Sequence, residues 1–547
     1  MMKNETKKQT FDRSAGVLMS ISSLPSDYGI GTMGKAAYEF ADFVRACNHK
    51  YWQVLPIGST TYGDSPYQSY SAFAGNPYFI DLDMLAEDGL LLKSDMLAVD
   101  WGDGKVPVHI SEEEAGNGNF TQNTDIGLGN ECYVSYEKMY QNRFAVLRKA
   151  FESYKAVRSE SRVKLAAGLP EYKKYDNFIR DNADWIENYA LFMAVKDQFD
   201  GVAWNEWAED IRLRWSNAMD YYRRELYYEI EFYSYLQFVF MKQWKKLKNY
   251  ANINGIEIIG DIPIYVSLDS ADAWSHPELF QLDEHCTPKA VAGCPPDGFS
   301  ADGQMWGNPL YDWDYHKKTE YAWWIERLSF CFELYDVVRI DHFRGFDEYY
   351  SIPYGDKTAV NGSWKKGPGM DLFRTIEKKI GRKSVIAEDL GYITDTVRKL
   401  VADSGFMGTK VLEFAFDTRD TGSAREYLPH NYIENCVAYT GTHDNETLVG
   451  WWQEVDDEGR KKARDYLCDY YTPADKMYIP LIGVIMRSNA KICIVPIQDY
   501  LGLDNRSRMN TPSSVGSNWR WRVDSKALNK TLAKEIKAIT VRYERCN

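Results

Sequence analysis

Eight short apolar runs recur along the chain, and most of them end in a polar loop or a loop rich in Gly and Pro. Helical stretches, such as residues 36–47, separate several of these runs. Near-continuous apolar strands that alternate with helices are typical of a parallel sheet covered on both faces. The pattern predicts an α/β fold, a (β/α)8 TIM barrel, while a doubly wound open sheet would give a similar pattern. The runs are residues 17–21, 51–56, 257–263, 337–341, 384–389, 410–414, 435–440 and 491–496.

A long segment between the second and third runs interrupts the alternation. We predict that residues 85–235 form an inserted, mostly helical subdomain, with helices at 185–199 and from 227 to about 250, where Asn254 and Gly255 provide a stop signal. Because insertions into barrels usually decorate the mouth, this one should shape ligand binding rather than carry chemistry. We assign residues 11–84 and 236–525 to the barrel, 265–335 to a loop subdomain at its mouth, and 526–547 to a C-terminal helical tail.

Charge and composition narrow the function classes. The net charge of the 547 residues is −14, which argues against nucleic-acid or anionic-membrane binding and fits a neutral substrate. No uninterrupted apolar stretch of eighteen residues is present, so we expect no membrane span. The nine Cys include no CxxC pair, which indicates reduced thiols in a cytoplasmic protein. Aromatic residues make up 15% of the chain, and they could fill the core or form stacking platforms for sugar rings.

Metal-binding signals are weak in this sequence. His276, His285, Cys286 and Cys294 lie within one stretch, but their spacing matches no zinc finger. The chain also carries no dedicated oxygen-rich loop of the kind that binds calcium. We therefore predict neither a metal nor a cofactor.

Acidic residues stand at the ends of three predicted strands. Asp341 ends the fourth, and Arg339 shares its face because side chains alternate along a strand. A neighbouring guanidinium favours the ionised carboxylate, although such a pair could equally serve only to close a loop. Glu388 and Asp389 end the fifth strand, and Asp444 follows the seventh.

These acids would converge at one end of a parallel barrel. Two carboxyl groups across a glycosidic bond can divide the work, since one attacks carbon while the other protonates the leaving oxygen. A third carboxylate can bind sugar hydroxyls and raise the pKa of the acid. His443, beside Asp444, is a suitable hydroxyl donor, and the spacing leaves Glu388 and Asp389 both open as the acid.

Specific motifs recur along nearly the whole chain: SSLP (22–25), WQVLP (52–56), DSPYQ (64–68), GNP (75–77), GDIPIYV (260–266), PPDGFS (295–300), GQMWGNP (303–309), RIDHFR (339–344), AEDLG (387–391), GTHDN (441–445) and RMNTP (508–512). From Gly16 to about Arg522 the chain thereby resembles the 4-α-glucanotransferases (amylomaltases, or disproportionating enzymes) of the α-amylase clan. Departures from the family pattern occur at Ser26, at residues 31–34 and at residues 513–516, away from the acids.

The resemblance implies Asp341 as nucleophile, Glu388 rather than Asp389 as acid/base, and Asp444 as stabiliser of the transition state. It places Arg339 beside the nucleophile and His443 on the sugar. It also implies that residues 295–299 form a lid on the acceptor side, where the loop subdomain would lie. Five further residues match positions that line the glucan groove: Tyr67, Asp261, Asp297, Gln304 and Trp306.

The implied activity is transfer of α-1,4-glucan segments from a maltooligosaccharide to the 4-hydroxyl of an acceptor glucan or glucose, with retention through a glucosyl-Asp intermediate. The expected partners are α-1,4-glucans and glucose, and the expected state is a monomer or homodimer. We find no starch-binding module in the sequence and expect short, soluble glucans to be preferred. An α-amylase-like hydrolase would carry the same carboxylates, and a silent glucan-binding protein is disfavoured by the intact trio.

Overall fold

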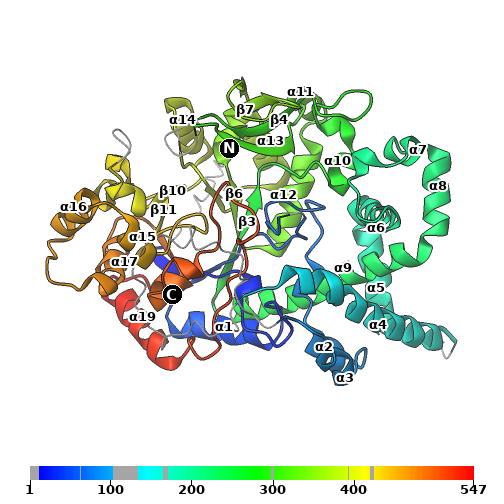
Figure 1. Ribbon diagram of the computed structural model, residues 1–547, viewed down its shortest axis with the longest axis horizontal. Coiled ribbons are helices and arrows are strands. Elements are labelled where there is room, and N and C mark those ends of the chain that lie inside the picture. Colours follow the sequence, from blue (N-terminus) through cyan, green and yellow to red (C-terminus); the bar gives the residue numbers. More distant parts are fainter. Residues whose placement is uncertain are drawn as a thin grey trace, which may run out of the picture.

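Eight parallel strands form the central sheet of the computed structural model, which describes residues 12–61, 63–102, 133–163, 170–296, 301–391, 393–418 and 424–546. The strands are β1 (Ser14–Leu18), β2 (Tyr51–Gln53), β3 (Glu257–Pro263), β6 (Val337–Asp341), β9 (Val385–Ala387), β10 (Gly408–Val411), β11 (Cys436–Tyr439) and β12 (Ile492–Pro496). Their order in the sheet is β10-β11-β12-β1-β2-β3-β6-β9 (Figure 1).

The two ends of this sheet meet. Ile386 on β9 bridges Met407 beside β10, and the Ala387 amide donates to the Met407 carbonyl at 2.8 Å. The sheet therefore comes round into a barrel rather than staying an open, doubly wound sheet. The predicted fold class is confirmed.

Two strands start earlier than predicted. β1 covers Ser14–Leu18 instead of 17–21, and β10 covers Gly408–Val411 instead of 410–414. In both cases the chain leaves the sheet while the sequence is still partly apolar and enters a 3₁₀ turn, at Ile21–Ser23 and at Glu413–Phe416. The apolar side chains beyond these strands pack under the mouth of the barrel, which is why the apolar runs extend past the hydrogen-bonded residues.

Helices pack around the barrel through one apolar face each. In α1 (Lys35–Ala46), the residues Ala37, Phe40, Ala41 and Val44 recur at helical spacing, and all four are buried. The other helices outside the insertion are α10 (Ala271–Ser275), α11 (Trp313–Lys318), α12 (Ala322–Leu334), α13 (Met370–Ile380), α14 (Asp395–Ser404), α15 (Leu448–Glu454), α16 (Asp457–Leu467), α17 (Tyr478–Met486), α18 (Ile497–Leu501) and α19 (Lys530–Arg542).

A helical insertion lies between β2 and β3 and projects to one side of the barrel (Figure 1, right). Its last helix ends at Ile253, where Gly255 has a φ of 81°, as the stop signal predicts. That helix runs unbroken through the expected boundary at residue 235 and packs against β3. The helices of this region are α2 (Leu82–Glu87), α3 (Lys93–Leu97), α4 (Tyr136–Val163), α5 (Pro170–Asp181), α6 (Ala183–Gln198), α7 (Glu209–Arg212), α8 (Ser216–Glu225) and α9 (Tyr227–Ile253).

A second, antiparallel sheet lies beyond the barrel strands (Figure 1, top). Its strands are β4 (Ala290–Cys294), β5 (Gln304–Pro309), β7 (Glu348–Pro353) and β8 (Ser363–Lys366), in the order β5-β4-β7-β8. The first two strands follow β3 and the last two follow β6. The segment 265–335, predicted as the loop subdomain, therefore contains only half of this sheet.

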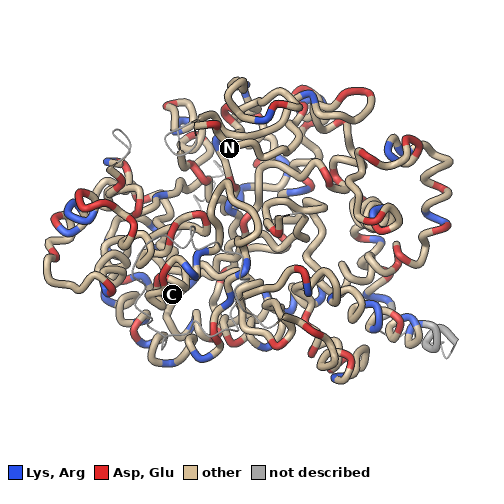
Figure 2. The backbone as a smooth tube through the Cα atoms, viewed as in Figure 1, with Lys and Arg blue, Asp and Glu red and all other residues tan. Residues whose placement is uncertain are grey.

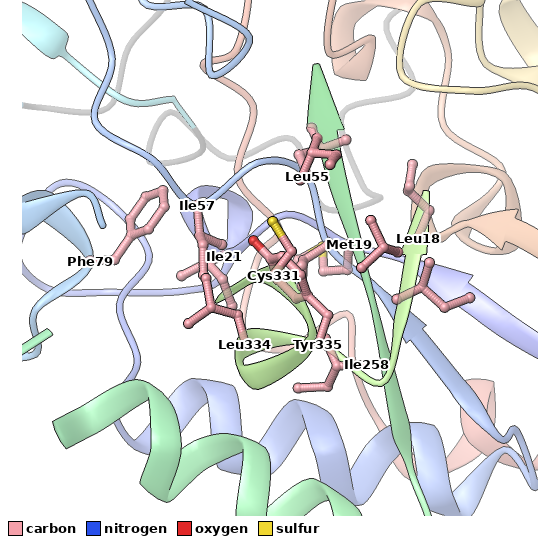
Figure 3. Close-up of a cluster of buried hydrophobic side chains, with 14 of the residues drawn as sticks. Leu18, Met19, Ile21, Leu55, Ile57, Phe79, Ile258, Cys331, Leu334 and Tyr335 are labelled. Carbon is pink, nitrogen blue, oxygen red and sulfur yellow. The ribbon is translucent and has the colours of Figure 1, made fainter. Parts of the chain in front are cut away.

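Aromatic and aliphatic side chains fill the interior. Figure 3 shows one region of it, in which Ile21 and Ile57 lie beside Cys331, Leu334 and Tyr335 of the α12 region. Among the described residues no helix is long and apolar enough to cross a membrane. Acidic and basic residues alternate along the peripheral helices (Figure 2). Five Trp are almost fully buried and serve the core rather than a surface platform: Trp52, Trp204, Trp244, Trp274 and Trp324.

One buried arginine closes the bottom of the barrel. Arg545 has no exposed area, and its guanidinium donates to the carbonyl oxygens of Ser14 (3.1 Å) and Lys491 (3.2 Å), which precede or begin β1 and β12. It also donates to the carbonyls of Met486, Ser488 and Ala490 at 2.7–3.0 Å. These carbonyls lie between the end of α17 and the start of β12, where Arg545 satisfies them in place of water, together with Arg13 at Met486 and Ser488.

Arg545→Met should therefore lower the free energy of unfolding by about 3–5 kcal/mol, since buried carbonyls lose a charged donor. Urea denaturation followed by circular dichroism measures this change. Arg542→Met, at the exposed end of α19 three residues before Arg545, is the matched control and should change stability by less than about 0.5 kcal/mol. Equal effects of the two substitutions would refute this role for Arg545.

Candidate active site

The ends of β6 and β9 are joined at the mouth of the barrel. Asp341 is the last residue of β6, and the next residue, His342, has a φ of 51°. The strand thus ends at Asp341, as the sequence predicts. This left-handed turn directs the His342 amide to the Oε2 atom of Glu388, at 2.7 Å. The backbone after one acidic residue therefore holds the carboxyl group of another.

Arg339 lies beside Asp341, as the alternation of side chains predicts. Its Nη1 atom donates to Oδ1 of Asp341 at 3.0 Å and to both carboxylate oxygens of Asp261 at 2.7 Å. Asp261 is completely buried and lies behind the guanidinium. Asp341 in contrast keeps 28% of its side-chain exposure. The ion pair thus fixes a carboxylate that a ligand can still reach.

Asp341 and Glu388 influence each other's ionisation. Burial raises the pKa of both carboxyl groups, because charged groups are less stable away from water. Arg339 opposes this most strongly at Asp341, to which it is directly bonded. The charge of Asp341 raises the pKa of Glu388 further. Glu388 therefore holds its proton to a higher pH than Asp341 does.

The neighbouring acid, Asp389, has a different environment. Its Oδ1 atom accepts the Thr409 amide at 2.6 Å, on the side of β10. Glu388 instead accepts the amides of His342 and Leu390 through its two oxygens. Of the two acids that the spacing left open, Glu388 is the one bonded to the turn after Asp341.

Asp444 forms a second anionic centre across the mouth. Its Oδ2 lies 3.3 Å from Nε2 of His443, and Asn510 donates to its Oδ1 at 2.6 Å. Burial raises the pKa of Asp444, but the imidazole and the amide outweigh burial and lower it to about 2. At His443, burial disfavours the charge, yet Asp444 raises the pKa above its ordinary value. Asp444 is therefore ionised at any pH well above 2.

Tyr67 connects the two centres. Its hydroxyl donates to Oδ2 of Asp261 at 2.9 Å and lies 3.3 Å from Nδ1 of His443. Its ring stacks on the His443 ring, with centroids 4.9 Å apart. A continuous chain of polar contacts therefore runs from Asp341 through Arg339, Asp261, Tyr67 and His443 to Asp444.

Gln304 and Trp306 lie on β5. The Trp306 indole donates to the Gln304 side chain at 3.1 Å, and its ring meets the His342 ring edge-on, with centroids 4.7 Å apart. β5 thus lies against the turn that follows Asp341. Asp297, and with it most of the predicted lid at 295–299, lies outside the described residues.

Comparison with known proteins identifies the family. The family model described as 4-alpha-glucanotransferase matches residues 19–528. The chain belongs to the 4-alpha-glucanotransferase family. The resemblance found in the sequence is thereby confirmed, and with it the enzyme class.

Members of the 4-alpha-glucanotransferase family match this chain over nearly its full length. The 4-alpha-glucanotransferase of Clostridium butyricum is 44% identical, covering 96% of this chain and 100% of the relative. The Thermus thermophilus enzyme of the same name is 41% identical, covering 97% and 99%. Among solved structures, the amylomaltase from Streptococcus agalactiae in complex with acarbose has a TM-score of 0.87 at 39% identity, covering 98% of this chain and 100% of that one.

Sequence reasoning missed two residues that hold Asp444 in this family member. Asn510 bonds its carboxylate, and Arg508 donates to its backbone carbonyl at 2.6 Å. Both lie in the stretch RMNTP (508–512) that follows the last barrel strand, and its match to the family motif was the signal that could have indicated them. Among the described residues, no group of three or more His, Cys, Asp and Glu side chains could hold a metal ion.

Glu413 is a further buried acid near the candidate active site. It follows β10 and lies against the loop that carries Asp444, with its Oε1 2.8 Å from the place that a Cβ on Gly441 would occupy. Within the described part of the chain that oxygen has no hydrogen-bond partner. Burial, followed by the charges of Glu446 and Asp499, raises the pKa of Glu413 well above its ordinary value. Glu413 therefore keeps its proton to a higher pH than an exposed carboxyl group does.

Glu413→Gln should stabilise the protein at neutral pH. A carboxyl group whose pKa is raised by folding costs nothing below its unfolded pKa, and its cost grows as the pH rises toward the folded pKa. The stability gain should be near zero at pH 4 and grow as the pH rises to 7. Urea denaturation at both pH values measures it, with the exposed Glu458→Gln as control. A gain that does not grow with pH would contradict the raised pKa.

Proposed function

We propose that the protein transfers α-1,4-glucan segments from a donor maltooligosaccharide to the 4-hydroxyl of an acceptor glucan or glucose, with retention of configuration. The observation that supports this proposal most directly is a pair of carboxyl groups at the ends of neighbouring strands. Asp341 is a carboxylate that a ligand can reach, and Glu388 is a buried acid with a raised pKa. Such a pair suits double displacement, in which one group attacks carbon and the other moves the proton. The acarbose bound by the Streptococcus agalactiae relative supports a saccharide at this site.

In the first step, protonated Glu388 gives its proton to the glycosidic oxygen of the donor. Asp341 attacks the anomeric carbon as the bond to that oxygen breaks, which forms a β-linked glucosyl ester on Asp341. Arg339 keeps Asp341 ionised and aimed, because it bonds one carboxylate oxygen and leaves the other free. The released segment carries the proton on its 4-hydroxyl.

In the second step, the carboxylate of Glu388 takes the proton of the acceptor 4-hydroxyl. The acceptor oxygen attacks the anomeric carbon and displaces Asp341, so two inversions restore the α configuration. Asp444 and His443 are assigned to the hydroxyls of the sugar that changes shape. Their contacts would strengthen as positive charge develops on the ring, because Asp444 is anionic.

Water could replace the acceptor in the second step, and hydrolysis would follow. Trp306 and Gln304, which lie against the turn after Asp341, are assigned to acceptor binding. An aromatic face binds a sugar ring well and water poorly. Transfer therefore depends on the occupancy of this side of the site.

Trp306→Ala should weaken the binding of maltotriose by about 1–3 kcal/mol, which is the usual cost of a lost aromatic contact in a binding groove. Initial rates over a range of maltotriose concentrations measure the change in KM. Trp215→Ala removes a half-exposed indole beside α8, far from the strand ends, and serves as the control. An unchanged KM for Trp306→Ala would remove its role in glucan binding.

Incubation of the purified protein with maltotriose tests the proposed function. Glucose and a ladder of longer maltooligosaccharides should form while total reducing ends stay nearly constant. Reducing ends that rise with substrate loss, without longer chains, would identify a hydrolase instead. Binding of maltotriose without any product would identify a silent glucan-binding protein.

A further inference from the structure

Two amide side chains pair across the candidate site, away from the acids. Nε2 of Gln68 donates to Oδ1 of Asn308 at 3.1 Å, and Nδ2 of Asn308 lies 3.4 Å from Oε1 of Gln68 in the reverse direction. Gln68 directly follows Tyr67, and Asn308 comes two residues after Trp306. The pair thus links the loop that carries Tyr67 to the strand that carries Trp306.

The pair is anchored on both sides. Asn308 is 5% exposed, and its Nδ2 also donates to the Val266 carbonyl at 2.7 Å, in the loop after β3. Nε2 of Gln68 also lies 3.4 Å from the carbonyl of Trp306. Three segments therefore meet at one amide pair: the loop with Tyr67, the loop after β3, and β5.

The backbone of β5 explains why such an anchor is needed. Met305 pairs with Gly293 of β4, and Pro309 pairs with Val291, so three residues of β5 stand opposite a single residue of β4. The three are Trp306, Gly307, whose φ is 76°, and Asn308. β5 is also one of the two edge strands of its sheet. This bulged segment has no regular ladder, and the carbonyl of Trp306 is held by Gln68 instead.

Tyr67, in contrast, is fixed to the barrel by its contacts with Asp261 and His443. The amide pair thus connects the loop that carries Tyr67, which is held against the barrel, to the bulge that carries Trp306, and so can fix the position of that bulge. Neither Gln68 nor Asn308 contacts Asp341 or Glu388 through any hydrogen bond among the described residues.

We propose that Gln68 and Asn308 are positioning residues whose amide pair holds the Trp306 bulge in register with the Tyr67 side of the barrel, and that this register sets the ratio of transfer to hydrolysis. The inference rests on the proposed function. Formation of the glucosyl ester needs only the acids, whereas capture of a sugar acceptor needs Trp306 in its place. Displacement of a binding group by about 1 Å can cost up to about a hundredfold in rate.

Gln68→Ala and Asn308→Ala test this inference in the maltotriose assay. Each should lower the ratio of transfer to hydrolysis by about tenfold and raise the KM for a glucose acceptor. The rate of fluoride release from α-maltosyl fluoride in the absence of acceptor should stay within about twofold. The double variant should be no worse than the worse single variant, because both substitutions break one unit. Gln68→Glu, which can accept from Asn308 but cannot donate to Trp306, should lie between wild type and Gln68→Ala.

Gln243→Ala is the matched control. This buried glutamine of α9 pairs reciprocally with the backbone of Asp81, at 2.7 and 3.1 Å, away from the acids. It should lower stability and leave the transfer ratio unchanged. A wild type that transfers, together with Gln68→Ala and Gln68→Glu variants that keep its ratio, would overturn the inference. A wild type that transfers nothing would instead overturn the proposed function itself.

Discussion

Asp341→Asn is expected to abolish turnover of maltotriose, with a loss on the order of 10⁴-fold or more, as for other nucleophile substitutions. The amide has no anionic oxygen with which to form the ester, so the first step fails. Folding should survive, because both carboxylate oxygens of Asp261 continue to pair with Arg339. Product analysis measures the loss, and the melting temperature checks the fold.

Asp336→Asn is the matched control for this substitution. Asp336 precedes the same strand at its opposite end, where its carboxylate accepts the Ile258 amide and the side chain of Asn252. Its replacement should cost some stability and leave the chemistry unaltered. An Asp341→Asn enzyme that keeps near-normal transfer would remove Asp341 as the nucleophile.

The barrel could be predicted from the sequence because parallel strands are buried on both faces. Each strand therefore appears as a short apolar run, and the helices between the strands have their own spacing. The antiparallel sheet was not predicted. Its strands are short and partly polar, and β5 is interrupted by the bulge at Trp306. Irregular pairing of this kind leaves no period of two in the sequence.

The candidate site divides in the same way. Arg339 and Asp341 are two residues apart on one strand, so their contact follows from strand geometry alone. The contact between Tyr67 and His443 joins residues 376 positions apart, and that between Asp444 and Asn510 joins two loops. No local pattern specifies such pairs, because they depend on which strand ends meet when the barrel closes. The resemblance named three of these residues, and the structure supplies their contacts and adds Asn510.

The left-handed turn at His342 shows the limit most clearly. Sequence alternation places Asp341 at a strand end but gives no reason for its neighbour to adopt a positive φ. In the structure that conformation aims one backbone amide at Glu388. A backbone direction therefore decides that Glu388, and not Asp389, is bonded to the turn after Asp341, and side-chain patterns do not record such a direction.

Glu388→Gln should separate the two roles of its carboxyl group. Maltotriose, whose leaving group needs a proton, should react at least 10³-fold more slowly, on the scale of general acid catalysis and beyond. α-Maltosyl fluoride needs no such proton, so its first step should persist and a maltosyl ester should accumulate. Mass spectrometry of the quenched protein should then locate the added maltosyl group on Asp341.

Azide provides the complementary measurement. It needs no general base, so it should attack the anomeric carbon of the accumulated ester, displace Asp341 and yield α-maltosyl azide. Wild-type activity on maltotriose should fall on the alkaline side as Glu388 loses its proton, at a pH above the ordinary carboxyl value of 4.5. Ester formation from the fluoride needs no general acid, so it should lack this alkaline fall in the wild type and in the Glu388→Gln enzyme alike. Asp389→Asn, one residue away, should behave like wild type in all three measurements. If Asp389→Asn instead accumulated the ester and responded to azide, the acid/base role would belong to Asp389.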